Sequence, residues 1–299
     1  MLIMLKIVIE RLHNIGGMCP YGRKENELPN TSTVSTQISA ERTQYRVGHG
    51  GFHSTIVTTP GLTMQQPLVY VYDIGAKPSL ARARDAIECF VARLKMLKSN
   101  RVEYVILSHV DEDHVNGLKD LLEKLAAANI SVGFVMLPWL STTEKLMAKA
   151  HANHRFPSAV VMNLSGDDRD TVEYLAGLGV ENVAFLQSEG STATSQDLPS
   201  VLNSAGTPVR ARFVASGTDL TAPHKIPWKL VTMRMEPPKG ALPAFTKKIK
   251  DLTGLDPEDP PNHPMLLTQY RRSISTAMAT AASAVGFKAM GIHSQIGPA

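Results

Sequence analysis

The chain has 299 residues, of which 43% are hydrophobic and 19% charged, and its formal net charge is +4 at pH 7. This composition is ordinary for a globular protein with a sizeable core. The two cysteines, Cys19 and Cys89, exclude a disulfide framework and a thiolate metal site, and they favour a reducing compartment. The densest basic stretch, from Arg82 to Arg101, favours a solvated helix face over a phosphate site, so charge alone does not indicate nucleic acid.

Residues 1–40 are expected to form a peripheral N-terminal arm. Met1 to Glu10 are mostly apolar, but Lys6 interrupts the run, which is too short to span a bilayer. The polar run 30–37 favours a flexible arm or an extra strand. We therefore expect a cytoplasmic protein without a membrane partner.

From residue 41 onward, hydrophobic patterning predicts alternating strands and helices. The expected strands are 45–47, 52–58, 68–73, 102–107, 131–137, 180–186, 209–214 and 228–235. The expected helices are 79–98, 116–128, 141–154, a helix through Leu178, and a final one over 270–288. This alternation predicts a layered α/β domain.

The most informative stretch is a buried strand that ends in a loop of metal-type ligands. His109, Asp111, Asp113 and His114 lie within six residues, and neutral imidazole and carboxylate suit zinc, manganese or iron. Alternatively, the loop only caps the next helix, with Asp113 at the N-cap and Glu112 in the first turn. A cap does not require two histidines around two aspartates, so we favour the metal site.

The loop reads Ser-His-x-Asp-x-Asp-His-x-x-Gly-Leu, which resembles the ligand loop of metallo-β-lactamase-fold hydrolases. It is closest to the His-x-Asp-x-Asp-His branch, as in the hydrolase domain of bacterial DNA-uptake channel proteins. Tyr45 to Gly51 resembles the first strand and glycine loop of that family, and Val69 to Gly75 resembles its strand ending in Asp-x-Gly. The resemblance covers residues 45–138 and fades beyond them.

The resemblance implies an αββα sandwich over residues 41–299 and up to two divalent ions, zinc or manganese, with no other cofactor. His109 and Asp111 would hold the first ion, Asp113 and His114 the second, and Asp113 would act as the catalytic residue. The implied activity is hydrolysis by a metal-activated water, and the expected substrate is a phosphodiester in nucleic acid or a nucleotide. The alternative is a degenerate or truncated module with a structural or partner-binding role.

The later ligands of the family are not recognisable. Gly166-Asp167 superficially matches a bridging motif, but N-capping of the next helix is the better interpretation. His49 and His53 are interpreted as non-ligand histidines. Five further histidines lack the context of the family, namely His151, His154, His224, His263 and His293. We therefore expect a chain that is divergent or shortened after about residue 240, whose exposed sheet edge favours a homo-oligomer.

Overall fold

The computed structural model describes residues 5–11, 39–58, 66–152, 159–187, 198, 200–203, 206–220, 228–234 and 239–284. The polar run 30–37, Cys19, His154, His224 and His293 lie outside these residues, and the side chain of His151 is likewise not described. None of the helices in the described parts of the chain is long and apolar enough to cross a bilayer.

A mixed sheet forms the centre of the molecule, with the strand order β2-β3-β4-β5-β6-β7-β9-β8. Its strands are β2 (Ser39–Gln44), β3 (Phe52–Thr58), β4 (Leu68–Ile74), β5 (Arg101–Ile106), β6 (Ser131–Pro138), β7 (Asn182–Gln187), β8 (Val201–Leu202) and β9 (Pro208–Ala215). Strands β4, β5, β6, β7 and β9 are parallel neighbours, while β2, β3 and β8 pair antiparallel. The parallel part places the carboxyl ends of β4 to β7 at one edge of the sheet.

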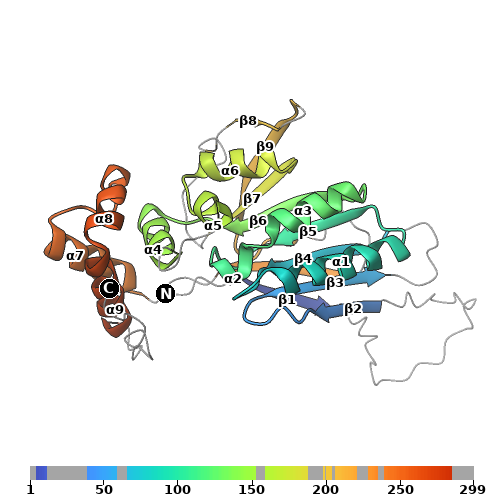
Figure 1. Cartoon of the computed structure of the whole chain (residues 1–299), viewed down its shortest axis with the longest axis horizontal. Helices are drawn as coiled ribbons and strands as arrows, with labels where there is room; N and C mark the ends of the chain where they lie inside the picture. The colour runs from blue at the N-terminus through green and yellow to red at the C-terminus, as the bar shows by residue number, and fades with distance from the viewer. Residues whose placement is uncertain are drawn as a thin grey trace, which may run out of the picture.

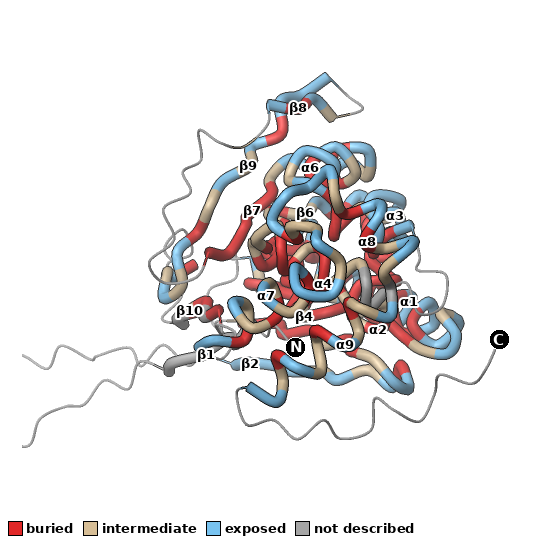
Figure 2. Tube along the Cα trace, turned by 90° about the vertical axis from the view of Figure 1, so that its left-hand side faces the viewer, coloured by how far each residue is buried: buried red, intermediate tan, exposed pale blue. Residues whose placement is uncertain are grey.

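Helices cover one face of this sheet (Figure 1). They are α1 (Ala81–Met96), α3 (Leu118–Ala127), α5 (Ala159–Leu164) and α6 (Asp168–Gly177). Apolar side chains at helical spacing, such as Phe90 of α1 and Leu121 of α3, share one buried cluster with Val71 of β4 and Val105 of β5. Figure 2 shows buried residues along the strands and on the sheet-facing sides of these helices. The predicted α/β layering is confirmed.

The opposite face of the sheet has its own apolar cluster. Tyr70, Tyr104 and Met136 alternate along their strands with residues of the helix-side cluster, as the two-residue period of a strand requires. Leu230 of β10 (Trp228–Arg234) packs on this face, and β10 pairs antiparallel with β1 (Leu5–Arg11). Part of residues 1–40 is thus a strand, whereas the run 30–37, for which an extra strand was one alternative, lies outside the described residues.

After β10 the described chain is helical. It forms α7 (Ala241–Thr253), the 3-10 turn η2 (Pro260–Asn262), α8 (His263–Gln269) and α9 (Arg271–Ala284), which pack with α4 (Thr142–Ala152). Their shared core includes Leu146, Phe245, Leu266 and Ile274. This bundle stands at one end of the molecule in Figure 1. A capping box begins α4, since Ser141 N donates to Glu144 Oε2 and Glu144 N donates to Ser141 Oγ.

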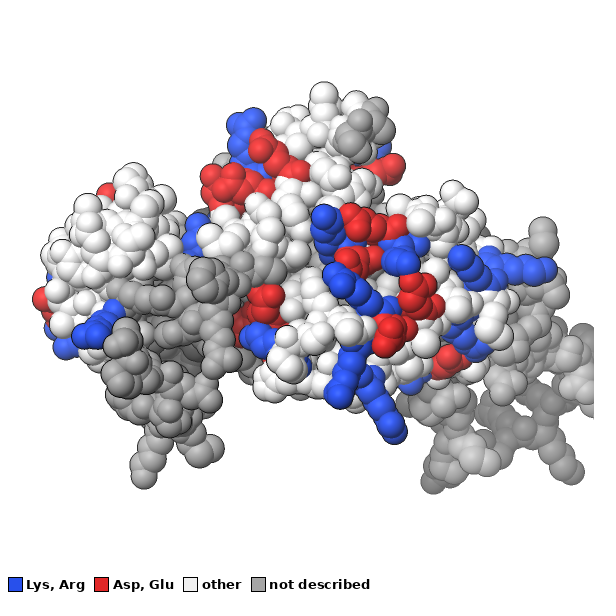
Figure 3. Space-filling model, in the orientation of Figure 1, with Lys and Arg blue, Asp and Glu red and all other residues white. Residues whose placement is uncertain are grey.

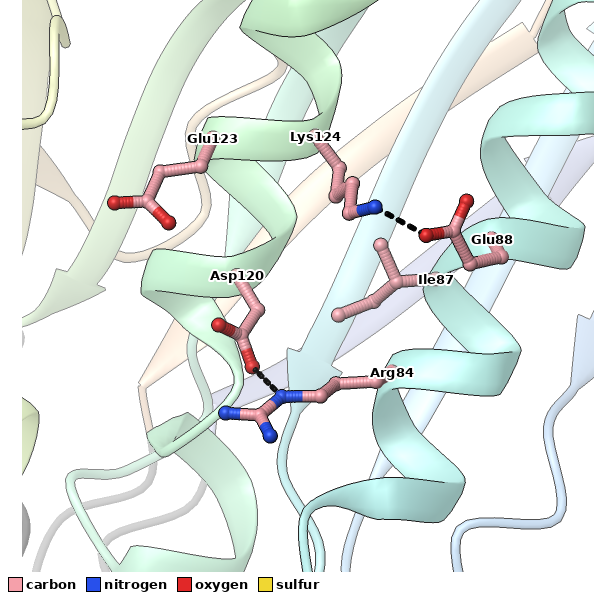
Figure 4. Close-up of a pocket in the computed structure, with 6 residues that line it drawn as sticks. All are labelled: Arg84, Ile87, Glu88, Asp120, Glu123 and Lys124. Atoms are coloured by element: carbon pink, nitrogen blue, oxygen red, sulfur yellow. Dashed lines mark hydrogen bonds and ion pairs between the residues drawn. The ribbon is translucent and has the colours of Figure 1, made fainter.

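Charged side chains of both signs mix on the solvent side of α1 and α3 (Figure 3). A hollow between these helices is lined by Arg84, Glu88, Asp120 and Lys124, among others (Figure 4). Arg84 Nε lies 2.7 Å from Asp120 Oδ2, and Lys124 pairs with Glu88. The basic groups of this hollow are therefore neutralised locally, which agrees with a solvated helix face.

His263 gives the helical bundle a testable pH dependence. Its side chain is buried at the start of α8, Nε2 donates to the carbonyl of Pro257, and burial lowers the pKa of His263. The unfolded chain therefore binds a proton more readily, so stability falls as pH drops below the ordinary histidine pKa of about 6.5. We expect the loss in urea-unfolding free energy between pH 7.5 and 5.5 to be smaller in His263→Gln than in the wild type. An equal loss in both proteins would contradict this assignment.

Candidate metal site

The metal-type loop lies at the edge of the sheet where the parallel strands β4 and β5 end. Asp73 stands at the end of β4, Ser108 follows β5, and α2 (Glu112–Val115) carries the last two members of the motif. Figure 1 shows α2 at one end of the sheet, and its backbone contacts β4. The glycine turn before β3 reaches the same edge, because β3 runs antiparallel to β4.

Backbone hydrogen bonds join this glycine turn to α2. Gly51 N donates to the carbonyl of Asp113, and Gly75 N donates to the carbonyl of Gly51, at 3.0 and 2.9 Å. The amide of Asn116 donates to the carbonyl of Ala76 and accepts from its N–H, at 2.9 and 3.0 Å. Three segments far apart in the sequence are thereby held together around the loop.

Close packing at Gly75 gives a test of this arrangement. A Cβ at Gly75 would lie 2.5 Å from the carbonyl oxygen of Asp113 and 2.6 Å from the backbone nitrogen of His114. Gly75→Ala must therefore displace the loop, and an error of about 1 Å in such a site costs roughly 100-fold in rate. We expect Gly75→Ala to lower any metal-dependent turnover by about that factor, measured as kcat/KM. The control is Gly177→Ala, where a Cβ meets nothing within 4 Å and activity should stay unchanged.

Asp73 and Ser108 orient the two imidazoles of the loop. Asp73 accepts from Ser108 N and Ser108 Oγ, both at 2.7 Å, and from His114 Nδ1 at 2.9 Å. Because the Ser108 hydroxyl donates to Asp73, it accepts from His109 Nδ1, at 2.8 Å. Both rings thus carry a proton on Nδ1 in their neutral form, which leaves Nε2 as the coordinating nitrogen. Asp73 therefore supports the loop through hydrogen bonds to Ser108 and His114.

Each Nε2 atom faces a carboxylate of the loop. His109 Nε2 lies 3.4 Å from Asp111 Oδ2, and His114 Nε2 lies 3.8 Å from Asp113 Oδ2. Two ligands about 2.1 Å from a tetrahedral ion are roughly 3.4 Å apart, so the first pair matches the edge of such a site and the second is slightly wider. The two rings lie 3.9 Å apart between centroids. Each pair therefore offers one imidazole and one carboxylate donor, which are ligand types that divalent metal ions accept.

A family comparison agrees with this geometry. Residues 68–194 match the model of the metallo-beta-lactamase superfamily. The matched stretch covers somewhat less than half of the chain and includes Asp73, the whole ligand loop and the helix that follows. The match indicates a metallo-beta-lactamase fold and a metal-dependent hydrolase. No curated protein matches the chain.

The further ligands typical of a metallo-beta-lactamase site are not found. Among the residues that the structure describes, the four loop residues included, no group of three or more His, Cys, Asp or Glu side chains is arranged to hold a metal ion. Asp167 accepts from Asp170 N at 2.7 Å and caps α6, so the N-cap interpretation is confirmed. His263 lies in the helical bundle, bonded to Pro257, and is a structural residue. The assignment of the four loop residues as ligands stays a prediction.

The helix-cap alternative for the loop is wrong for Asp113, which is not the N-cap residue, whereas Glu112 lies in the first turn of α2 as that alternative expected. Asp111 occupies the N-cap position of α2 without a side-chain hydrogen bond to the helix. Asp113 lies inside α2, and its carboxylate faces Lys77 and His49. His53 stands in β3 with its ring edge-on to Tyr72, so it is a strand residue.

Neighbouring charges shift the pKa values of His114 and Asp113 in the loop. Burial tends to lower the pKa of His114, but the hydrogen bond to Asp73 and the charges of Asp73, Asp113 and Asp111 outweigh it, so its pKa is raised. Burial tends to raise the pKa of Asp113, but the charge and hydrogen bond of Lys77 dominate and its pKa is lowered. Asp113 is therefore ionised near neutral pH.

Two residues of the site were missed by sequence reasoning. Lys77 Nζ lies 3.2 Å from Asp113 Oδ1, and the Ser108 hydroxyl bridges Asp73 and His109. Ser108 is adjacent to the motif, which was a usable signal. Lys77 follows the Asp-x-Gly strand by two residues, and nothing in its local pattern distinguishes it from a surface lysine.

Proposed function

We propose that this protein is a metal-dependent phosphodiesterase of the His-x-Asp-x-Asp-His branch, similar to the hydrolase domain of bacterial DNA-uptake channel proteins. One observation carries the proposal: two imidazole Nε2 atoms face two carboxylates at 3.4 and 3.8 Å, with both Nδ1 atoms engaged behind them. Such an arrangement is what metal-ligating histidines require.

The residues of the loop have distinct roles in this proposal. His109 and Asp111 would hold one ion, and Asp113 and His114 form the second donor pair. A divalent ion held there would supply a water molecule whose pKa is low enough for attack near neutral pH. Asp113, whose carboxylate faces Lys77 and His49, would accept the proton of this water, while Asp73 and Ser108 keep the two rings aimed at the site.

Asp111 adjusts the preference for metal. In the commoner form of the family motif this position is a histidine, and a carboxylate replaces a neutral nitrogen donor with a charged, hard oxygen donor. The site then prefers manganese or magnesium to zinc, and it prefers phosphoesters to β-lactams as substrates. Metal analysis that finds stoichiometric zinc, not exchanged by manganese, would contradict this preference.

The proposal is tested with the purified full-length chain. After dialysis against a chelator and reloading with Mn²⁺, it should hydrolyse bis-p-nitrophenyl phosphate or DNA. A thioester and a lactone serve as comparison substrates, because the fold alone does not specify the ester. Turnover of either comparison substrate, without phosphodiester cleavage, would support a hydrolase but contradict the proposed phosphodiester substrate.

A second candidate is a non-catalytic module that binds a partner. It is favoured by the incomplete ligand set among the described residues. Calorimetric titration with Mn²⁺ and Zn²⁺ separates the two candidates. No tight site, together with no turnover of any ester, would support the module.

Two further expectations complete the proposal, namely a cytoplasmic location and a homo-oligomer. The oligomer is supported by β2, which lies at one edge of the sheet with mostly exposed side chains. Light scattering of the purified chain measures its oligomeric state, and a monomer at micromolar concentration would contradict this expectation.

A further inference from the structure

Asp113, the central carboxylate of the second donor pair, is already paired on both of its oxygens. Lys77 Nζ lies 3.2 Å from Oδ1, and His49 Nε2 lies 3.1 Å from Oδ2. The Asp113 side chain is only 12% exposed, so little water remains to take over these contacts. The side-chain ammonium group of Lys77 thus occupies the position from which a second metal ion would need to approach Asp113.

The backbone holds Lys77 and His49 in this position. Lys77 N donates to the carbonyl of His49 at 2.7 Å, in an isolated antiparallel bridge between the two residues. The preceding residue, Ala76, is fixed by two hydrogen bonds to the Asn116 side chain, from the end of α2. The base of the lysine side chain is therefore anchored to the same helix that carries Asp113.

Charge balance points the same way. Three carboxylates face the two imidazoles, those of Asp73, Asp111 and Asp113, while the Glu112 carboxylate accepts from the side-chain amide of Asn116. Both histidines are neutral when they bind metal. One divalent ion and the Lys77 ammonium together carry three positive charges, which match the three carboxylates. A second divalent ion beside Lys77 would add two uncompensated charges at close range in a part-buried site.

We propose that the site holds a single divalent ion on the His109–Asp111 pair, and that the Lys77 ammonium takes the place of the second ion. This inference rests on the proposed function, since it assumes that the loop binds metal. Lys77 is then a positioning residue that keeps Asp113 ionised and oriented without a metal bond.

The test measures metal content, not turnover. Each full-length variant is stripped, dialysed against Mn²⁺, and analysed for bound manganese per chain by mass spectrometry. We expect one ion in the wild type and in Lys77→Arg, and two in Lys77→Met. The matched control is Lys119→Met, an exposed lysine on α3 paired with Glu123, which should retain one ion.

Variants of the ligands distinguish which pair binds. His109→Ala should lose the single ion, whereas Asp113→Asn should keep it, so the inference remains testable if Lys77→Met fails to fold. Two ions in the wild type, one ion in a folded Lys77→Met, or loss of the ion in Asp113→Asn would each overturn the inference while leaving a metallohydrolase. No bound manganese in the wild type would overturn both this inference and the proposed function.

Discussion

His114→Ala is expected to reduce manganese-stimulated cleavage of bis-p-nitrophenyl phosphate to the rate of the uncatalysed reaction. The substitution removes the Nε2 donor that faces Asp113, and it also removes the hydrogen bond from α2 to Asp73. Asp73 then retains just its contacts with Ser108, and the loop loses one of its two fixed imidazoles. The measurement is kcat/KM for the purified variant at saturating Mn²⁺.

A control is needed because any buried histidine substitution perturbs a fold. His263→Gln removes a buried imidazole from the helical bundle, outside the ligand loop, and should retain wild-type turnover at neutral pH. Asp73→Asn should give an intermediate result, because loss of the carboxylate that orients a metal-binding histidine costs about 10–100-fold in affinity or activity. Wild-type turnover by His114→Ala would show that the loop takes no part in catalysis.

Glu144→Ala is expected to cause the largest loss of stability. Glu144 on α4 forms a buried ion pair with Arg234 at the end of β10, with Arg234 NH2 2.8 Å from Glu144 Oε1 and both side chains at most 3% exposed. Arg234 Nε has no hydrogen-bond partner among the described residues, so the guanidinium depends strongly on Glu144. Removing one partner of a buried pair leaves an uncompensated charge and costs about 3–5 kcal/mol.

Urea unfolding, followed by circular dichroism, measures this loss. Asp251→Ala breaks the exposed Lys247–Asp251 pair on α7 and serves as the control, with an expected change under about 1 kcal/mol. The double variant Glu144→Leu with Arg234→Met should recover much of the stability, because well-packed apolar groups replace a buried pair at little cost. A loss in Glu144→Ala as small as that of the control would show that water reaches the pair.

The sequence predicted the part of the site that is contiguous. One strand, one loop and one helix contain all four proposed ligands, so spacing alone placed His109 to His114 at the edge of a sheet. The Asp-x-Gly strand was also readable, because a carboxylate at the end of a neighbouring parallel strand must reach the same edge. Five helices were predicted, those that correspond to α1, α3, α4, α6 and α9, and their ends differ from the observed ones by a few residues. Helices α2, α5, α7 and α8 were not predicted.

Contacts between distant segments could not be predicted in this way. The pairing of Lys77 and His49 with Asp113 depends on the glycine turn and on the Asn116 bridge, and local patterning is silent about both. The same holds for Arg234 and Glu144, which are 90 residues apart in sequence. Such contacts depend on the three-dimensional path of the chain, which one sequence does not specify.

The strand order has a practical consequence for the segment that matches the family. Strand β7 is bordered on one side by β9, which comes after residue 194, and the apolar face of the sheet is closed by Leu220 and by Leu230 of β10. In a polypeptide limited to residues 68–194, the backbone hydrogen-bonding groups of β7 that pair with β9 would be unpaired, and the apolar face of the sheet would be exposed to solvent. Such a fragment would aggregate, because segments after residue 194 cover the edge and the apolar face of the sheet in the whole chain.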